Sequence, residues 1–348
     1  MSKSSPIKIV QYNVQTFKDE SDEIDLYARF MISKCAVVCI QENRKTYSGI
    51  KDMYGYLRCI AAGQSGSHGV EVAISKTCPF ATDIEGNKIF VEREHVSILY
   101  SDPRCIIVRV CSKALDFYVV SAHAPFLQST TNHKKWWEFF KSQVKTSCRF
   151  NKPVLIGIDI NCQIYESELF SKWEMETKGG KHPANFTTMC NCVSELGIVF
   201  PAGDLSKHSN PSEYGTYNPT VGNKTIIIDQ IGTIGHIQVV PNSLCTAPDL
   251  TRALQTDKDH IPICAVVCIP TSDVSNHHVR RRVVGYDVSK IHDKECAEAF
   301  RDKIKTFPVI GVEVENSSHC HLIHNFLQEA LIECFPKSSI KQKEGVYH

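Results

Sequence analysis

Short apolar runs of strand length recur along the first 270 residues, separated by a few longer amphipathic segments. Runs rich in β-branched and aromatic residues predict strands, and they cover residues 8–14, 36–42, 70–75, 105–111, 117–124, 154–161, 225–233 and 263–269. Helical periodicity predicts helices over residues 22–32, 133–148 and 184–198. Because helices do not follow every strand, the pattern predicts an α+β fold of mixed sheets packed face to face with helices outside, rather than a doubly wound parallel sheet.

Two of the predicted helices carry recognisable stripes. In residues 22–32, Ile24, Tyr27 and Met31 recur at helical spacing. The helix over residues 133–148 has an apolar stripe that most simply predicts core contacts, namely Trp137, Phe140, Val144 and Cys148. It also has basic positions that most simply predict a solvated face, although they could contact phosphates, namely Lys134, Lys135, Lys141 and Lys145.

The character of the chain changes after Pro270. Residues 271–282 have the composition of a linker, in which Arg280, Arg281 and Arg282 could form a basic patch. Residues 294–307 and 320–335 then predict a pair of amphipathic helices. We therefore expect a main domain over residues 1–270, followed by a linker and small helical tail over residues 271–348.

Charge and cysteine content narrow the class of protein. The net charge is only +1, so bulk charge gives no argument for nucleic-acid binding. Many of the sixteen cysteines lie in apolar runs, where a free cysteine behaves as a small hydrophobe. The N-terminal residues contain no apolar secretory segment, and no apolar run approaches the ~18 residues of a membrane span. We expect an intracellular protein with reduced thiols, no targeting signal and no membrane span.

Zinc binding is an alternative role for some of the cysteines. Cys190 with Cys192 could supply two ligands, and Cys320 lies among His319, His321 and His324. A structural zinc site needs a second correctly spaced pair, which the sequence does not provide beside either group. Free thiols remain the favoured interpretation.

Polar residues stand at or near the C-terminal ends of several predicted strands. They are Asn13, Glu42, His123, Asp159, Asn161 and Asp229, joined by Asp259 and His260 just before the last strand. Each has an ordinary structural explanation by itself, such as a turn contact or a surface ion pair. Together they place carboxylates, amides and imidazoles at or near the ends of predicted strands. Clustered carboxylates repel one another unless a cation lies among them, so the set predicts a hard divalent metal with oxygen ligands.

The order of these segments resembles the endonuclease/exonuclease/phosphatase superfamily. The segments are YNV, IQE, SAHAP, GIDIN, IIDQI and KDHIPI, and the resemblance covers about residues 7–269. The most similar members look like endonuclease domains of non-LTR retrotransposons, because Thr216-Tyr217 precedes the IID segment. The resemblance implies a four-layer α/β/β/α sandwich of DNase type with its site at one edge of both sheets. It further implies a DNA substrate, Mg²⁺ or Mn²⁺ as cofactor, a nuclear place of action, and a reverse transcriptase as partner in a longer element.

The resemblance also assigns roles to individual residues. Glu42 would bind the metal, with Asp259 and Asn13 completing the shell directly or through water. Asp159 would orient or deprotonate the attacking water, and Asn161 would hold the phosphate beside it. Asp229 would fix the tautomer of His260, which would bind the scissile phosphate. In this family either the aspartate or the histidine could be the base. His123 would donate to the phosphate or the leaving group.

Three positions depart from the family pattern. Gln15 stands where apurinic endonucleases carry a second acidic metal ligand, which weakens a two-metal interpretation. Ile158 adds one residue between Gly157 and Asp159, and Lys258 replaces the usual serine before Asp259. None of these changes removes a functional side chain.

Two alternatives to a DNA endonuclease stay open. The same fold could act as a phosphatase on inositol lipids or as a nuclease that removes poly(A). The chain could instead be a catalytically dead nucleic-acid-binding domain. Retention of Glu42, Asp159, Asp229 and His260 together argues against a dead domain.

Overall fold

The computed structural model describes residues 3–17, 19–63, 67–125, 130–149, 152–164, 183–201, 216, 227–252, 260–271, 290, 292–307, 323, 326–327, 329–331 and 333–335. The chain separates into two compact units, Met1–Val274 and Ser275–His348. The domain boundary expected at residue 270 stays a prediction. Among the described residues, none of the helices is both long and apolar enough to cross a membrane.

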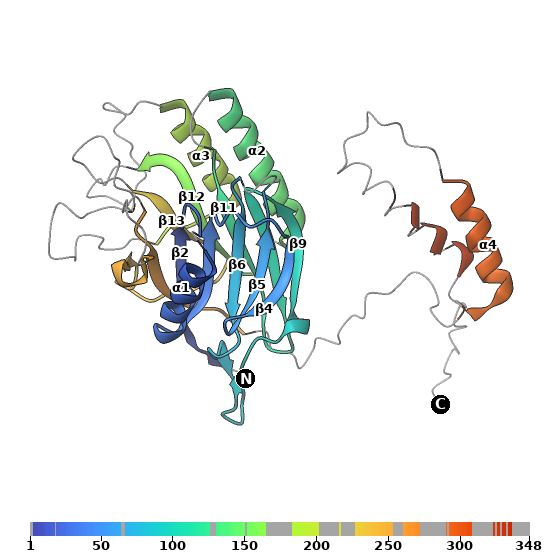
Figure 1. Ribbon diagram of the computed structural model, residues 1–348, viewed down its shortest axis with the longest axis horizontal. Helices are drawn as coiled ribbons and strands as arrows, with labels where there is room; N and C mark the ends of the chain where they lie inside the picture. Colours follow the sequence, from blue (N-terminus) through green and yellow to red (C-terminus); the bar gives the residue numbers. More distant parts are fainter. Residues whose placement is uncertain are drawn as a thin grey trace, which may run out of the picture. The chain divides into compact units, whose positions relative to one another are not determined.

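Two large sheets form the first unit (Figure 1). The larger has eight strands, which in spatial order are β14 (Gln238–Val239), β16 (Ile263–Cys268), β2 (Pro6–Asn13), β3 (Cys35–Gln41), β6 (Val70–Ser75), β5 (Tyr56–Ala61) and β4 (Gly49–Met53), with β15 (Cys245–Thr246) also paired to β16. The smaller has five, in the order β13 (Ile227–Ile234), β12 (Val154–Ile164), β11 (Asp116–His123), β10 (Cys105–Cys111) and β9 (Val96–Asp102). Short strands β1 (Lys3–Ser4), β7 (Ala81–Thr82) and β8 (Lys88–Ile89) form a third sheet.

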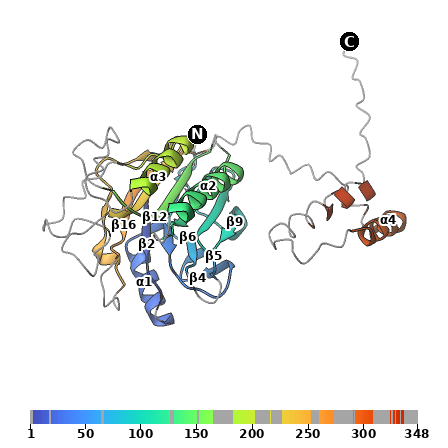
Figure 2. The ribbon, with the colours of Figure 1, turned by 90° about the horizontal axis from the view of Figure 1, so that it is seen from above.

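Three separate apolar cores define four layers. One core lies between the two large sheets and contains residues of both, such as Ile9 and Leu155. A second joins the five-stranded sheet to α2 (Thr130–Ser147) and α3 (Pro183–Leu196). A third joins the eight-stranded sheet to α1 (Glu20–Ile32). Figure 2 shows α2 and α3 on one side of the sheets and α1 on the other. The α/β/β/α sandwich expected from the resemblance is therefore confirmed.

Helix α1 packs with a different face from the one indicated by spacing. Asp19 caps its start, because Asp22 donates its backbone N–H to Asp19 Oδ1 at 2.9 Å. Its buried apolar residues are Leu26, Tyr27 and Phe30. Of the three residues noted in the sequence, Ile24 and Met31 remain 46% and 41% exposed. The sequence pattern was ambiguous here because apolar residues occur on more than one side of this helix.

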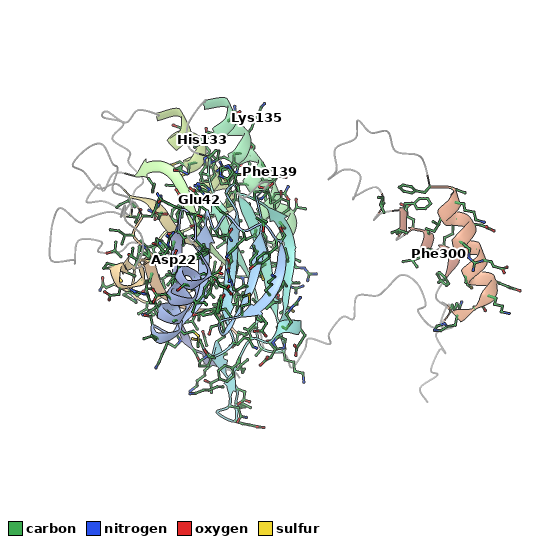
Figure 3. All side chains as sticks on the ribbon, viewed as in Figure 1. Asp22, Glu42, His133, Lys135, Phe139 and Phe300 are labelled. Carbon is green, nitrogen blue, oxygen red and sulfur yellow. The ribbon has the colours of Figure 1, made fainter. Side chains whose placement is uncertain are left out.

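Helix α2 follows its predicted pattern. Trp137, Phe140, Val144 and Cys148 are all buried against the five-stranded sheet and α3. Lys141 forms ion pairs with Glu138 at 2.8 Å and with Glu195 of α3 at 3.0 Å. Lys135 is exposed on α2 (Figure 3). The basic positions therefore belong to a solvated face, partly neutralised by neighbouring carboxylates.

Close contact between the two sheets requires glycine at position 157. A Cβ atom added there would lie 2.3 Å from Cys39 Cβ and 3.3 Å from Gln11 Cγ. Each sheet has a parallel pair at this contact, β2 with β3 and β11 with β12. Strands of a parallel pair end at the same edge of their sheet. The fold therefore delivers the polar ends of all four strands to neighbouring positions.

The second unit is described in part. Helix α4 (Lys294–Lys305) begins at an Asp293 cap, whose Oδ1 accepts the backbone N–H of Cys296 at 3.0 Å. Phe300 contacts Phe335, and Phe307 contacts Phe326. The second helix predicted over residues 320–335 lies only partly within the described residues. The linker with Arg280, Arg281 and Arg282 lies outside them.

Candidate active site

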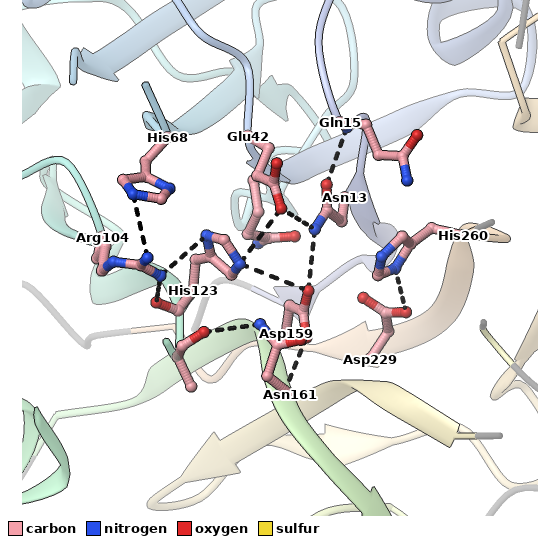
Figure 4. Close-up of polar contacts among 12 residues, drawn as sticks. Asn13, Gln15, Glu42, His68, Arg104, His123, Asp159, Asn161, Asp229 and His260 are labelled. Atoms are coloured by element: carbon pink, nitrogen blue, oxygen red, sulfur yellow. Dashed lines mark hydrogen bonds and ion pairs between the residues drawn. The ribbon is translucent and has the colours of Figure 1, made fainter. Parts of the chain in front are cut away.

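Five strand ends meet at one edge of the two sheets (Figure 4). Asn13 ends β2, and Glu42 follows β3 directly. From the other sheet, His123 ends β11 and lies opposite Asp159 of β12, which in turn lies opposite Asp229 of β13. Figure 3 shows Glu42 at this end of the sheets. Strand register aligns His123, Asp159 and Asp229 within one sheet. Packing of the two sheets brings Asn13 to Asp159, 146 residues away in sequence.

Asn13 bridges the carboxylates of the two sheets. Its Nδ2 donates to Glu42 Oε1 at 3.1 Å and to Asp159 Oδ2 at 2.9 Å. Its Oδ1 accepts the backbone N–H of Gln15 at 2.9 Å. Glu42 also contacts the guanidinium of Arg44, Nη2 to Oε2 at 3.4 Å. An amide N–H₂ group between two carboxylates occupies the place where positive charge is most favourable.

His123 faces the same pair of carboxylates. Its Nε2 lies 3.4 Å from Glu42 Oε1 and 3.8 Å from Asp159 Oδ2. Its Nδ1 lies 3.4 Å from Nη1 of Arg104. Because Arg104 can only donate, Nδ1 must accept, and the proton belongs on Nε2. Burial lowers the pKa of His123 well below its usual range, and the charge of Arg104 lowers it further. His123 is therefore a neutral donor toward the carboxylates.

The strand changes direction immediately after Asp159. The β12–β13 register shifts between Asp159 and Ile164, and Asn161 has a left-handed φ of 46°. The backbone N–H of Asn161 returns to Asp159 Oδ1 at 2.9 Å, and its Nδ2 donates to Ala124 O at 2.7 Å. This turn therefore ties Asp159 to the backbone of Asn161, while the side chain of Asn161 is held by Ala124.

Asp229 and His260 form a buried pair, as expected from the resemblance. Nδ1 of His260 lies 2.9 Å from Asp229 Oδ2. Thr216 supports the aspartate, because its Oγ1 accepts the backbone N–H groups of Ile228 and Asp229 at 3.1 and 3.0 Å. The sequence had singled out Thr216 only as half of a two-residue pattern. Its structural contact explains why a hydroxyl is useful at that position.

Burial and charge give the two acid–base candidates unusual pKa values. Burial, reinforced by the nearby Asp229, raises the pKa of Asp159 to about 7. Burial would by itself lower the pKa of His260, but the charge of Asp229 and its hydrogen bond outweigh this effect and raise it to about 9. Near neutral pH, Asp159 can therefore exchange a proton while His260 is a cation. Such separation of pKa values assigns different roles to neighbouring groups.

Two further residues extend the site, and neither was identified from sequence. Arg104 Nη2 lies 3.1 Å from His68 Nε2, and its Nη1 donates to His123 O at 3.3 Å. Both residues lie in connections between strands, where hydrophobic periodicity gives no signal. They place positive charge and imidazole nitrogens beside the Glu42 side of the site.

The donor set suits a hard divalent cation. Glu42 and Asp159 provide carboxylates from opposite sheets, and Asn13 contacts both of them. To reach a cation between them, the oxygen of Asn13 would have to give up the bond that it accepts from the Gln15 backbone N–H. A second group of ligand atoms, one each from Asp159, Asp229 and His260, lies within 4.8 Å of one another. Oxygen-rich sites of this kind match the preferences of Mg²⁺ and Mn²⁺.

Some predicted site residues cannot be placed. Asp259, Lys258 and Tyr217 lie outside the described residues, as do Cys320, His319, His321 and His324. Cys192 donates its Sγ–H to Trp137 O at 3.8 Å, as a packed thiol would. Within the described ranges, the Asp159 group is the only cluster of three or more His, Cys, Asp or Glu side chains arranged to hold a metal.

No protein-family model matches the sequence, and no curated protein matches it. Among solved structures, the chain is similar to AP endonuclease LMAP from Leishmania major, at 12% identity and a TM-score of 0.51, covering 76% of this chain and 88% of that chain. It is also similar to the endonuclease domain of TRAS1, a telomere-specific non-LTR retrotransposon, at 15% identity and a TM-score of 0.49 over 76% and 99% of the two chains. For an AP endonuclease from Archaeoglobus fulgidus, the identity is 17% and the TM-score 0.48 over 74% and 98%.

The likeness to the Leishmania enzyme shows the fold. This chain has the four-layer sandwich of an AP endonuclease, as its resemblance to the endonuclease/exonuclease/phosphatase superfamily implied. At 12% identity the likeness extends to the fold alone. The chemistry must therefore be argued from the residues at the sheet edge.

Proposed function

We propose that the chain is a metal-dependent phosphodiester hydrolase, and specifically an endonuclease that nicks one DNA strand and leaves a 3′-hydroxyl. The observation that carries this proposal is the meeting of Glu42, Asp159 and the Asp229–His260 pair at one edge of the two sheets. These residues come from separate strands or strand ends, and clustering of buried carboxylate and imidazole groups has no role in packing the apolar core.

Glu42 and Asn13 would hold the metal, and Asp159 lies within reach of the same cation. When bound, Mg²⁺ or Mn²⁺ would supply Lewis acidity toward a phosphoryl oxygen and the leaving oxygen. The group of Asp159, Asp229 and His260 is less favourable, because a protonated imidazole is not a metal ligand and the pKa of His260 is raised to about 9.

Asp159 is the favoured general base. Its raised pKa of about 7 lets it accept a proton from water near neutral pH. Asn161 holds one of its oxygens through a backbone N–H, which leaves Oδ2 directed toward Asn13 and His123. The water oxygen forms a bond to phosphorus, the bond from phosphorus to the 3′ oxygen breaks, and that oxygen takes a proton. The products are a 3′-hydroxyl and a 5′-phosphate.

His260 and His123 have separate roles toward the phosphate and the leaving oxygen. His260 is a cation fixed by Asp229, suited to bind a phosphate oxygen. His123 is a neutral Nε2–H donor that could serve the phosphate or the leaving oxygen. Proton transfer by a positioned base such as Asp159 would contribute about 10²–10⁴-fold to rate. Asn161, whose amide is engaged by Ala124, would contact the phosphate after a small rotation.

Incubation with supercoiled plasmid tests the proposal. With Mg²⁺ or Mn²⁺ we expect conversion to the open-circular form, and with EDTA we expect none. Extension of the nicks by a DNA polymerase without prior phosphatase treatment would confirm the 3′-hydroxyl. Parallel reactions with poly(A) RNA and an inositol phospholipid identify the alternative substrates. An intact plasmid that the protein binds but never cleaves, under every metal condition, would indicate a binding domain instead.

A further inference from the structure

A chain of buried amide hydrogen bonds crosses between the two sheets directly beneath the site. Gln11 of β2 donates from Nε2 to Gln41 Oε1 at 2.8 Å and to Asp229 Oδ1 at 2.8 Å. Gln41 donates in turn from Nε2 to Ser121 Oγ at 3.0 Å. Gln11, Gln41 and Ser121 are completely buried. The chain of bonds therefore ends on the aspartate that also holds His260.

The orientation of the Gln11 amide follows from its partners. Asp229 Oδ1 and Gln41 Oε1 can only accept while the aspartate is ionised. Reversal of the amide would place Gln11 Oε1 against both acceptors, so Nε2 must face them and each of its two protons serves one bond. Each oxygen of Asp229 then has its own donor, Gln11 for Oδ1 and His260 for Oδ2.

The two ends of the Gln11 amide differ, because its nitrogen makes two hydrogen bonds and its oxygen makes none among the described residues. Its Oε1 is buried and has no hydrogen-bond partner in the described part of the chain. A buried unpaired acceptor costs about 1–3 kcal/mol. An apolar side chain would avoid that cost, but it would leave Gln41 Oε1 and Asp229 Oδ1 without this donor. The amide is therefore placed by its donors, one of which holds the carboxylate that contacts His260.

Based on the function proposed above, we infer that Gln11 is a positioning residue of the reaction. Its amide holds Asp229 from the opposite sheet so that Oδ2 is directed at His260 Nδ1. Without this bond, the carboxylate can rotate about its side-chain torsions, and the imidazole loses its fixed orientation toward the phosphate. Gln11 acts only through Asp229 and touches no substrate.

The sharpest test replaces Gln11 with methionine, which keeps nearly the same shape and removes the donor. By analogy with metal sites, where loss of a residue that orients a ligand typically costs about 10–100-fold in activity, loss of the Gln11 donor should have an effect of this size. We expect Gln11→Met to lower kcat for plasmid nicking by this factor with KM nearly unchanged. The second readout is the proton signal of His260 Nδ1–H in protein labelled with nitrogen-15 histidine. We expect this signal to shift upfield or broaden, because the hydrogen bond to Asp229 becomes less ordered.

Ser121→Ala is the matched control. It removes hydrogen bonds at the far end of the same buried chain, to Gln41 and to Ile40 O, without contacting Asp229. It should lose comparable stability yet keep both kcat and the His260 signal. If Gln11→Met does not fold, Gln11→Ser replaces it in the test, because the serine side chain is smaller and leaves room for water. It should show the same loss.

The outcomes separate this inference from the proposed function. Wild-type kcat and an unchanged His260 signal in folded Gln11 variants would overturn the positioning role. Equal losses of kcat in Ser121→Ala and Gln11→Met would also overturn it, because they indicate a general packing effect. If the wild-type protein cleaves no phosphodiester at all, the proposed function fails, while a changed signal in Gln11→Met still shows that Gln11 orients the pair.

Discussion

Nδ1 of His260 lies 2.9 Å from Oδ2 of Asp229, and the two residues come from opposite sheets of the sandwich. His260 precedes β16 of the eight-stranded sheet, whereas Asp229 belongs to β13 of the five-stranded sheet. Both side chains are buried at 5% and 1% exposure, so this contact replaces water for both partners. A buried ion pair whose aspartate also accepts from Gln11 is costly to leave half-paired.

Removal of either partner should therefore lower turnover by orders of magnitude. We expect the Asp229→Ala, His260→Ala double variant to be little worse than His260→Ala, because residues that act as a unit are strongly non-additive. Single-turnover cleavage and melting temperature of the wild type and the three variants provide the measurement. Rate losses that multiply in well-folded variants would contradict a joint role.

The metal-free protein should become less stable as the pH rises. His260 has an ordinary pKa of 6.5 and a folded pKa of about 9, so its stabilising contribution is full below pH 6.5 and is lost as the pH rises through 9. Asp159 has an ordinary pKa of 3.8 and a folded pKa of about 7, so its contribution is full below pH 3.8 and is lost through pH 7.

Urea unfolding in EDTA between pH 5 and pH 9 measures this loss. The effect of each group should be on the order of 1–3 kcal/mol, because one pKa unit corresponds to about 1.4 kcal/mol. Asp159→Asn should remove the part of the loss below about pH 7. If wild type and Asp159→Asn differ in free energy of unfolding by the same amount at every pH in this range, the raised pKa of Asp159 is contradicted.

Much of the fold and site could be predicted from the sequence. The predicted strands over residues 70–75 and 105–111 coincide with β6 and β10. Short apolar runs rich in β-branched residues favour a strand over a helix. The polar ends at Asn13, Glu42 and Asp159 were visible because they interrupt apolar runs. The order of these ends, and not any single one, carried the resemblance.

Other features required the structure. The contact between Gln11 and Asp229 joins positions 218 residues apart, and a glutamine within an apolar strand does not reveal its partner. Its position two residues before Asn13, on the same strand face, was the available signal. Arg104 and His68 lie outside regular strands, so periodicity gave no indication of them. The turn at Asn161 was hidden because a left-handed φ interrupts an otherwise continuous strand pattern.

Gly157→Ala should destabilise the sandwich without direct effect on the chemistry. The added methyl would lie 2.3 Å from Cys39 Cβ, so the sheets must separate locally. Overpacking of this kind costs about 1–3 kcal/mol or more, measured as a lower melting temperature. The strongest conflict is with Cβ, and Sγ lies at 2.8 Å, so adding Cys39→Gly should restore more of the stability than adding Cys39→Ala, which removes only the Sγ conflict. Full stability of Gly157→Ala alone would show that the contact is looser than described.

A chain ending at Pro270 should fold and nick DNA as well as the full-length chain. Every candidate catalytic residue precedes this point, and Ile269 still packs in the core between the sheets. Melting temperature and plasmid nicking of the shortened chain are the measurements. Reduced nicking by a shortened chain that melts normally would assign a role in DNA binding or catalysis to the tail.

The most direct test of the account is Glu42→Gln, measured by plasmid nicking across a Mg²⁺ titration and by calorimetric titration with Mg²⁺. The exchange keeps the side-chain shape and removes the charge that would hold the metal. Glu195→Gln on α3 is the matched control, because Glu195 pairs only with surface lysines of α2 among its described contacts. We predict that Glu42→Gln abolishes nicking and weakens Mg²⁺ binding with a nearly unchanged melting temperature, while Glu195→Gln behaves as wild type. Nicking by Glu42→Gln at the wild-type rate and the wild-type Mg²⁺ dependence would contradict the proposed metal-dependent site.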